Sequence, residues 1–157
     1  MPQDVLDRWR NETSDDVVFR KRVETYLDSG HGDCWLRDGR IAKLVQDTLL
    51  FHAGKKYELW SWVIMPNHAH VVLTPMKGVH LPNVLHSIKS YTAQSANEIL
   101  GRKGQFWQHE SFDRYIRNSR HFASVIRYIE NNPVKAGLCL RPEEWQFGSS
   151  YYRNIEK

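Results

Sequence analysis

Cysteine is scarce in this chain of 157 residues, and its two cysteines, Cys34 and Cys139, form no CxxC pair. Their separation excludes a disulfide-stapled scaffold and a cysteine-rich zinc finger, and it is typical of proteins in a reducing compartment. No apolar run approaches the roughly 18 residues that a membrane-spanning helix needs. The first ten residues, MPQDVLDRWR, are polar and partly acidic, whereas a signal peptide begins basic and then becomes apolar. We therefore expect a cytoplasmic protein with no membrane partner.

Several sequence signals of common enzyme classes are also missing. The chain has no Gly-rich phosphate loop, no Ser or Cys nucleophile elbow and no paired acidic motif, so the sequence does not support an NTPase or a common hydrolase. It has no internal repeat and no linker long enough to divide it. Hydrophobic residues make up 41% of the chain, with six Trp, seven Tyr and six Phe, which is enough to build a core without disulfides. We expect residues 1–157 to form a single domain.

The positive charge is concentrated in one part of the chain. Residues 1–60 hold ten Lys or Arg and eleven Asp or Glu, whereas residues 86–135 hold eight Lys or Arg and four acidic residues. Aromatic residues such as Tyr91, Trp107 and Tyr115 lie between these basic residues. Basic and aromatic side chains together are typical of surfaces that bind single-stranded nucleic acid. A solvated basic face without a ligand is the other interpretation of the same charge.

Residue periodicity and turn signals predict alternating helices and strands. The expected helices are 15–29, 38–54, 81–100 and one that Ser119 caps and that Pro133 and Gly137 terminate, and the expected strands are 57–65, 68–74 and 112–117. Strands 57–65 and 68–74 form a hairpin around Pro66-Asn67. This order predicts an α+β fold in which helices pack on one antiparallel sheet. A ferredoxin-like arrangement needs one more strand before the first long helix, and residues 1–12 do not have the pattern of one.

His68 and His70 are the sharpest local feature. Residues i and i+2 of a strand point to the same face, so both imidazoles project together just after a turn. Two convergent imidazoles form half of a site for a divalent metal. Histidines separated by one residue also occur by chance, so the spacing alone leaves the metal site open.

Tyr128 and Asn132 lie four residues apart in the segment VIRYIENNPVKAG, and therefore on the same face of a helix. The Asn132 carbonyl oxygen can serve as a hard metal ligand beside the two imidazoles. The Tyr128 phenol, whose pKa is ordinarily near 10, becomes a better nucleophile beside a metal or a base. The alternative is that Tyr128 packs in the core while Asn132 satisfies the end of the helix before Pro133.

The other histidines are weaker candidates. His52, His80, His86, His109 and His121 are scattered without ligand spacing, which favours surface or packing positions. His109 and Glu110, in the segment FWQHE, are placed close to the site if the strand that begins at Phe112 carries them there.

Three motifs together resemble one known family. MPNHAHVVL, GQFWQHESFDRYIRN and YIENNPVKAGL occur in the order and rough spacing of the REP-associated tyrosine transposases, which are single-tyrosine members of the HUH nuclease superfamily. The similarity runs from about Tyr26 to Tyr151. It implies a ferredoxin-like fold and a metal-dependent transesterification on single-stranded DNA.

The resemblance also assigns roles to individual residues. His68 and His70 match the metal-binding pair, Asn132 matches a third ligand, and Tyr128 matches the nucleophile that forms a 5′-phosphotyrosine link and frees a 3′-hydroxyl. The implied metal is Mg²⁺ or Mn²⁺. The implied partners are hairpins of repeated extragenic palindromes, recognised with a short single-stranded guide beside the foot. The basic residues Lys89, Arg114, Arg117 and Arg127 are our candidates for phosphate contacts. A monomer and a homodimer both remain open.

One departure from the family bears on activity. Family members begin with a strand that is central in the ferredoxin-like sheet, and the chain starts after the point where that strand is expected. The sequence therefore leaves open whether the first strand is present, and loss of that strand exposes unpaired backbone. A missing strand favours one alternative, a non-catalytic DNA-binding protein that retains the fold. A separate alternative is a metal-dependent hydrolase that uses the histidine pair with bound water.

Overall fold

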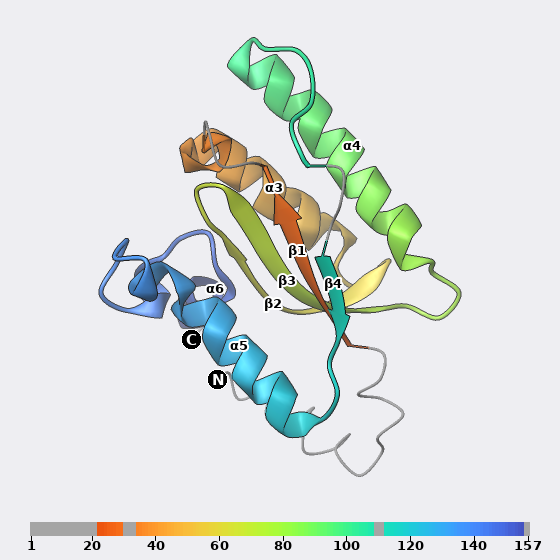
Figure 1. Ribbon diagram of the computed structural model, residues 1–157, viewed down its shortest axis with the longest axis vertical. Helices are drawn as coiled ribbons and strands as arrows, with labels where there is room; N and C mark the ends of the chain where they lie inside the picture. The colour runs from red at the N-terminus through yellow and green to blue at the C-terminus, as the bar shows by residue number, and fades with distance from the viewer. Residues whose placement is uncertain (1–21, 30–33, 109–111, 156–157) are drawn as a thin grey trace.

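The fold is an antiparallel sheet with helices on both faces, seen in a computed structural model of the chain (Figure 1). The structure describes residues 22–29, 34–108 and 112–155. Its strands are β1 (Val23–Asp28), β2 (Tyr57–Ile64), β3 (His68–Pro75) and β4 (Phe112–Tyr115). Its helices are α3 (Gly39–His52), α4 (Leu81–Leu100), α5 (Ser119–Lys135) and α6 (Ser149–Ile155), with 3₁₀ turns η1 (Trp35–Arg37) and η2 (Pro142–Glu144). None of the helices in these described ranges is long and apolar enough to cross a membrane.

The strand order is β2-β3-β1-β4, and each neighbouring pair is antiparallel. This is the order of a ferredoxin-like sheet, and it confirms the α+β expectation. β1 and β3 are the two inner strands, while β2 and β4 form the edges. The sheet therefore contains the central first strand whose presence the sequence left open.

The expected helix over residues 15–29 is wrong where the structure describes it, because residues 23–28 form strand β1. The error has a physical cause in the spacing of Val23 and Leu27. Residues four apart share a face in a helix and also share a face in a strand, so this pair cannot distinguish the two. Hydrogen bonding to β3 and β4 on both sides decides in favour of the strand. The part of the expected helix before residue 22 lies outside the described residues.

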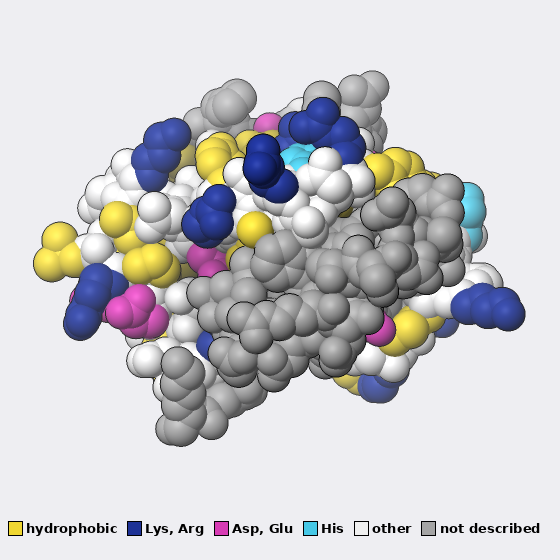
Figure 2. Space-filling model, turned by 90° about the horizontal axis from the view of Figure 1, so that it is seen from below, with side chains coloured by type: hydrophobic (Ala, Val, Ile, Leu, Met, Phe, Trp, Pro, Cys, Tyr) yellow, Lys and Arg dark blue, Asp and Glu magenta, His cyan; other side chains and the backbone are white. Residues whose placement is uncertain are grey.

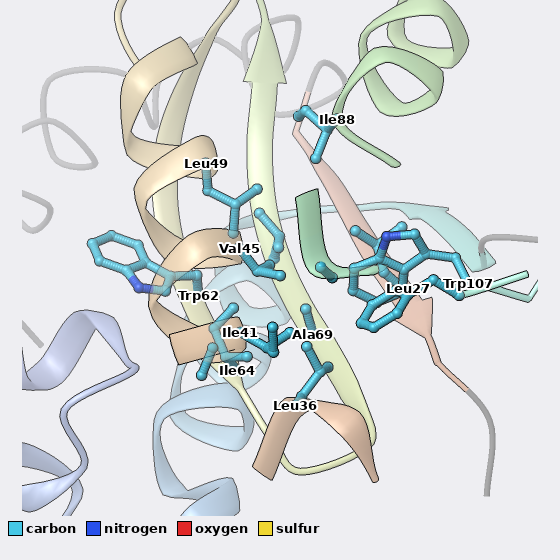
Figure 3. Packing of buried hydrophobic residues seen from close by; sticks show 14 of the residues in the cluster. Leu27, Leu36, Ile41, Val45, Leu49, Trp62, Ile64, Ala69, Ile88 and Trp107 are labelled. Atoms are coloured by element: carbon cyan, nitrogen blue, oxygen red, sulfur yellow. The ribbon is translucent and has the colours of Figure 1, made fainter. Parts of the chain in front are cut away.

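The larger core lies between the sheet and the pair α3 and α4. Ile41, Val45 and Leu49 form the inner stripe of α3 at helical spacing, and Ile88 of α4 packs in the same cluster as Ala69 of β3 (Figure 3). Asp38 caps α3, because its side chain accepts a hydrogen bond from the Arg40 backbone N–H at 2.9 Å. The apolar side chains of β1 and β3 that face this core force the intervening residues of both strands onto the opposite face.

Helix α5 covers that opposite face, where Phe122, Ile126 and Ile129 pack against Val72 of β3. Asn118, rather than Ser119, is the N-cap: its side chain accepts from the backbone N–H of His121 at 2.9 Å. The helix continues through Pro133 to Lys135 and does not stop at the proline. A proline in the last turn removes one backbone hydrogen bond near a frayed end, which costs less than in the middle of a helix.

Helix α6 was not expected, and it ties the C-terminal segment to α5. Glu130 of α5 forms a largely buried ion pair with Arg153 of α6 and accepts a hydrogen bond from Ser149 Oγ at 2.8 Å. Ser149 Oγ also lies 3.1 Å from Ser61 Oγ on β2. This cluster fixes α5 to both the sheet and the C-terminal helix.

Candidate active site

The strand register brings polar side chains of β1 and β3 together under α5. Tyr26 of β1 lies opposite His70 of β3, and Asp28 lies opposite His68. Leu27 and Ala69, which alternate with these residues, are buried in the core on the α3 and α4 side. Both histidines therefore face α5, as the His-x-His spacing predicts.

His68 is held in its neutral form. Its ring stacks on Tyr26 with 4.7 Å between ring centroids, and its Nδ1 lies 2.9 Å from Asn67 Oδ1. Burial, together with the neighbouring His70, lowers the pKa of His68 to about 4. A neutral imidazole is the form that binds a metal, because a protonated ring has no lone pair to donate.

Glu24 links His70 to a basic residue on the edge strand. Its Oε1 lies 2.6 Å from His70 Nε2, and its Oε2 accepts a hydrogen bond from Arg114 Nε at 2.9 Å. Burial opposes ionisation of Glu24, but the hydrogen bonds from His70 and Arg114 outweigh it and lower the pKa of this carboxyl group. An ionised carboxylate can only accept, so Nε2 of His70 carries a proton, and in the neutral ring Nδ1 holds the lone pair.

Tyr128 of α5 stands over this cluster. Its ring centroid lies 5.9 Å from that of His70, in an edge-to-face arrangement. The side chain is 54% exposed, which excludes the alternative that it packs in the core. Glu24, Tyr26, His70 and Tyr128 share an open pocket of about 690 Å³.

Apart from Val125, the rest of the pocket lining is basic or polar. Arg114 and Arg117 come from β4 and the segment that follows it, and His121 and Ser124 come from the first turns of α5. Seen from below, Lys and Arg side chains gather around a histidine near the upper edge of the view (Figure 2). His121 Nδ1 accepts a hydrogen bond from the Arg117 backbone N–H at 3.1 Å. Burial, with the nearby Arg114 and Arg117, lowers the pKa of His121. The pocket therefore offers cationic and neutral donors to an anionic group beside Tyr128.

The remaining sequence-predicted residues lie at varying distances from this pocket. Asn132 is half-buried one turn after Tyr128 and is not among the residues that line the pocket. Arg127 is exposed on α5 and also lies outside the lining. Lys89 lies on α4, at a different groove beneath the opposite face of the sheet. His109 and Glu110 lie outside the described residues.

Sequence reasoning missed Glu24, Tyr26 and His121. The first two were hidden by the expected helix, although the alternation of Val23, Thr25 and Leu27 with polar residues could have indicated a strand. His121 lies seven residues before Tyr128, which is two helical turns and hence the same face of α5. That spacing was the sequence signal that could have placed His121 beside Tyr128.

The donor atoms fit a divalent cation in part. Within the ranges that the structure describes, no three His, Cys, Asp or Glu side chains form a ready-made metal cluster. The chemistry of the set is nevertheless suitable, since His68 is neutral and shares a sheet face with His70, against which the ionised Glu24 lies. Mn²⁺ and Mg²⁺ both favour oxygen donors, but Mn²⁺ accepts imidazole nitrogen more readily than Mg²⁺ does.

Residues 40–132 match the family model described as "Transposase IS200 like". This span contains His68, His70, Tyr128 and Asn132 and covers more than half of the chain. The chain belongs to the IS200-like transposase family. The resemblance drawn from the three motifs is thereby confirmed at the level of the family.

Two comparisons with individual proteins agree with this family assignment. A curated relative, the REP-associated tyrosine transposase of Escherichia coli strain K12, is 26% identical over 105 residues, which cover 66% of this chain. The match spans 59% of that relative's length. A solved structure, described as a REP-associated tyrosine transposase bound to a REP hairpin, superposes with a TM-score of 0.70 at 21% identity. That alignment covers 88% of this chain and 81% of the solved one, and it shows that the two share a fold.

Proposed function

We propose that this IS200-like protein cleaves and rejoins hairpin-forming single-stranded DNA through a covalent 5′-phosphotyrosine link at Tyr128. The observation that carries the proposal is the position of Tyr128, exposed in an open pocket with its ring 5.9 Å from that of His70. A phenol in such a pocket has room to meet a phosphodiester. The REP hairpin named with the related solved structure supports a hairpin as the substrate.

In the proposed reaction, Tyr128 Oη attacks the phosphorus of one phosphodiester in line with the bond to the 3′-oxygen. The new bond joins Oη to the 5′-phosphate, and the bond from phosphorus to the 3′-oxygen breaks. The phenol loses its proton and the departing 3′-oxygen gains one, so a 3′-hydroxyl is released. Because one phosphodiester replaces another, the 3′-hydroxyl of the same or another strand can reverse the step without an external energy source.

The residues on the sheet hold and orient the reacting groups. His68, His70 and Asn132 are proposed to hold a divalent ion, Mg²⁺ or Mn²⁺, with the Glu24 carboxylate fixing the ring of His70. Such an ion supplies polarisation of a phosphate oxygen and makes the phosphorus a better electrophile. Arg114 and Arg117, which line the pocket, are proposed to neutralise the phosphates of the bound strand, with Arg127 on the exposed face of α5 extending this contact.

The test is a covalent-adduct assay with labelled hairpin oligonucleotides from the repeats of the source genome. The wild-type protein, Tyr128→Phe and the control Tyr91→Phe are each incubated with Mg²⁺, with Mn²⁺ and with EDTA. Tyr91 is a suitable control because it is similarly exposed, at 57%, but lies on α4. We expect a metal-dependent protein–DNA band on a denaturing gel for the wild type and Tyr91→Phe, and none for Tyr128→Phe.

The two alternative functions give different results in this assay. A non-catalytic DNA-binding protein shifts the hairpin on a native gel but forms no adduct with any metal. A metal-dependent hydrolase cuts the strand without an adduct and keeps its activity in Tyr128→Phe. Either result would refute the proposal and favour the corresponding alternative.

A further inference from the structure

His121 lines the open pocket that contains Tyr128, called the catalytic pocket below, but the reaction proposed above gives it no role. It lies in the first turn of α5, seven residues before Tyr128, and seven residues are close to two full helical turns. The two side chains therefore lie on the same face of the helix, with their Cα atoms about 10.5 Å apart along its axis. That spacing leaves room for one phosphate group between the imidazole and the phenol.

Two hydrogen bonds fix the position of His121. Its backbone N–H donates to the side chain of Asn118, the N-cap of α5, at 2.9 Å. Its ring Nδ1 accepts from the backbone N–H of Arg117 at 3.1 Å. Both the ring and its attachment to the helix are therefore held in place before a ligand binds.

The contact with Arg117 also decides which ring nitrogen carries the proton. A backbone N–H can only donate, so Nδ1 offers its lone pair and the proton of the neutral ring is on Nε2. Among residues 22–29, 34–108 and 112–155, which the structure describes, no group accepts a hydrogen bond from this Nε2. His121 therefore brings one unused donor to the catalytic pocket.

The surroundings of His121 keep its ring neutral. Burial, with Arg114 and Arg117 nearby, lowers the pKa of His121, and the nearby Glu24 carboxylate opposes this effect only in part. The positive end of the α5 dipole acts in the same direction as the two arginines, because His121 lies in the first turn of the helix. The ring is therefore a hydrogen-bond donor at neutral pH and does not serve as a source of protons.

The cationic donors of the pocket are less suited to select a single oxygen atom. Arg114 already donates from Nε and Nη2 to the Glu24 carboxylate, and 60% of its side chain is exposed. The side chain of Arg117 is exposed and forms no ion pair with any residue in the described ranges. Long exposed arginines neutralise phosphate charge over a range of positions, whereas a ring fixed at both ends points its donor at one place.

We propose that neutral His121 is a catalytic residue of the reaction at Tyr128, in which its Nε2–H donates a hydrogen bond to one non-bridging oxygen of the phosphate under attack. This inference rests on the proposed function and adds one donor to it. His121 keeps its proton throughout, so the bonds and protons of the proposed reaction balance as before. A donor fixed in advance stabilises the charged oxygens of the transition state without the cost of reorientation.

Two substitutions separate the donor at Nε2 from the structural contact at Nδ1. His121→Asn places an amide oxygen near the position of Nδ1, where it can still accept from the Arg117 N–H, but its side chain does not reach the position of Nε2. His121→Gln places an amide N–H near the position of Nε2 and loses the acceptor for Arg117. A catalytic donor and a purely structural ring therefore predict opposite outcomes for the two variants.

The measurement is the single-turnover rate of adduct formation with saturating hairpin and Mn²⁺. We expect this rate to fall about 100-fold in His121→Asn, as it does when one fixed donor to a transition state is removed, and to stay close to the wild-type rate in His121→Gln. The control His80→Asn changes an exposed histidine at the N-cap of α4, where asparagine is well tolerated, and should leave the rate unchanged.

A second measurement tests the contact itself. Hairpins are prepared with each of the two phosphorothioate diastereomers at the cleaved phosphate, since sulfur is a poorer hydrogen-bond acceptor than oxygen. We expect one diastereomer to slow the wild type through loss of the Nε2 contact and to slow His121→Asn much less. The result is a ratio of two rates for the same protein, so a variant that is partly unfolded still gives a valid answer.

The outcomes separate this proposal from the proposed function. A normal rate in His121→Asn, or a phosphorothioate ratio that is the same in the wild type and in His121→Asn for both diastereomers, overturns the role of His121 and keeps the reaction at Tyr128. Absence of any adduct in the wild type overturns both. If both variants are slow, the phosphorothioate ratio decides between a catalytic donor and a structural ring.

Discussion

Replacing Glu130 by alanine should destabilise the protein strongly, because this carboxylate joins three parts of the fold. The side chain of Glu130 is only 10% exposed and that of its partner Arg153 only 20%. Besides the ion pair, Glu130 accepts hydrogen bonds from Ser149 Oγ at 2.8 Å and from Ser61 Oγ at 3.4 Å. Glu130→Ala leaves the guanidinium without this partner in a mostly buried position.

The expected loss in the free energy of unfolding follows from the general behaviour of buried ion pairs. Removing one partner of such a pair costs about 3–5 kcal/mol, because the other charge stays desolvated and uncompensated. Replacing both partners by apolar residues is often close to neutral. Glu130→Met/Arg153→Met should therefore recover much of the stability that Glu130→Ala loses.

The assay is urea unfolding at pH 7, followed by tryptophan fluorescence. Lys43→Ala is the control, since Lys43 and Asp47 form an exposed pair, with 69% and 51% of their side chains accessible. Such a pair contributes about 0.3–0.5 kcal/mol. A loss below about 1 kcal/mol for Glu130→Ala, or no recovery in the double variant, would refute the argument that this cluster anchors α5.

Three further predictions concern the catalytic pocket. Glu24→Gln removes the charge that orients His70, and we expect the rate of adduct formation to fall about 10- to 100-fold in a gel time course, whereas an unchanged rate would mean that the carboxylate is dispensable. The pKa of His68 is about 4 in the folded protein and 6.5 in the unfolded chain. Between these two pH values the unfolded chain binds more protons, so the free energy of unfolding falls as the pH drops from about 6.5 to about 4. Allowing for partial exposure of the ring, the expected loss of stability is about 1–2 kcal/mol. Urea titrations at pH 7.5 and 4.5 should show this loss in the wild type but not in His68→Gln. An equal loss in both proteins would contradict the role of His68. Arg114→Ala and Arg117→Ala should each lower hairpin affinity and reduce the slope of log affinity against log salt by about 0.7–0.9, and slopes identical to the wild type would exclude phosphate contacts at these positions.

Much of the fold was predictable because it follows from local patterns. The stripe of Ile41, Val45 and Leu49, and the hairpin around Pro66-Asn67, specify α3, β2 and β3 without tertiary information. Strand β1 was not predictable in this way. The spacing of Val23 and Leu27 satisfies a helix and a strand equally, and only pairing with distant residues 68–73 and 112–115 resolves it.

In the candidate site, too, residues in local motifs were predictable and residues placed by long-range contacts were not. The histidine pair and Tyr128 were found because each lies in a short motif with its own periodicity. Glu24 was not found, because its contacts with His70 and Arg114 join residues 46 and 90 positions apart in the chain. Lys89 illustrates the opposite error: charge in the sequence grouped it with Arg114, but α4 places it at a different groove.

Mass spectrometry that locates the DNA on the protein is the direct test of the phosphotyrosine link at Tyr128. Trypsin cleaves after Arg127 and Lys135, so the peptide 128–135 contains Tyr128 as its only tyrosine. After reaction with a hairpin and Mn²⁺, followed by nuclease digestion, we expect a nucleotide linked through its 5′-phosphate to this peptide, together with a free 3′-hydroxyl on the released strand. An adduct on a different peptide, or cleavage products with water added and no modified peptide, would contradict it.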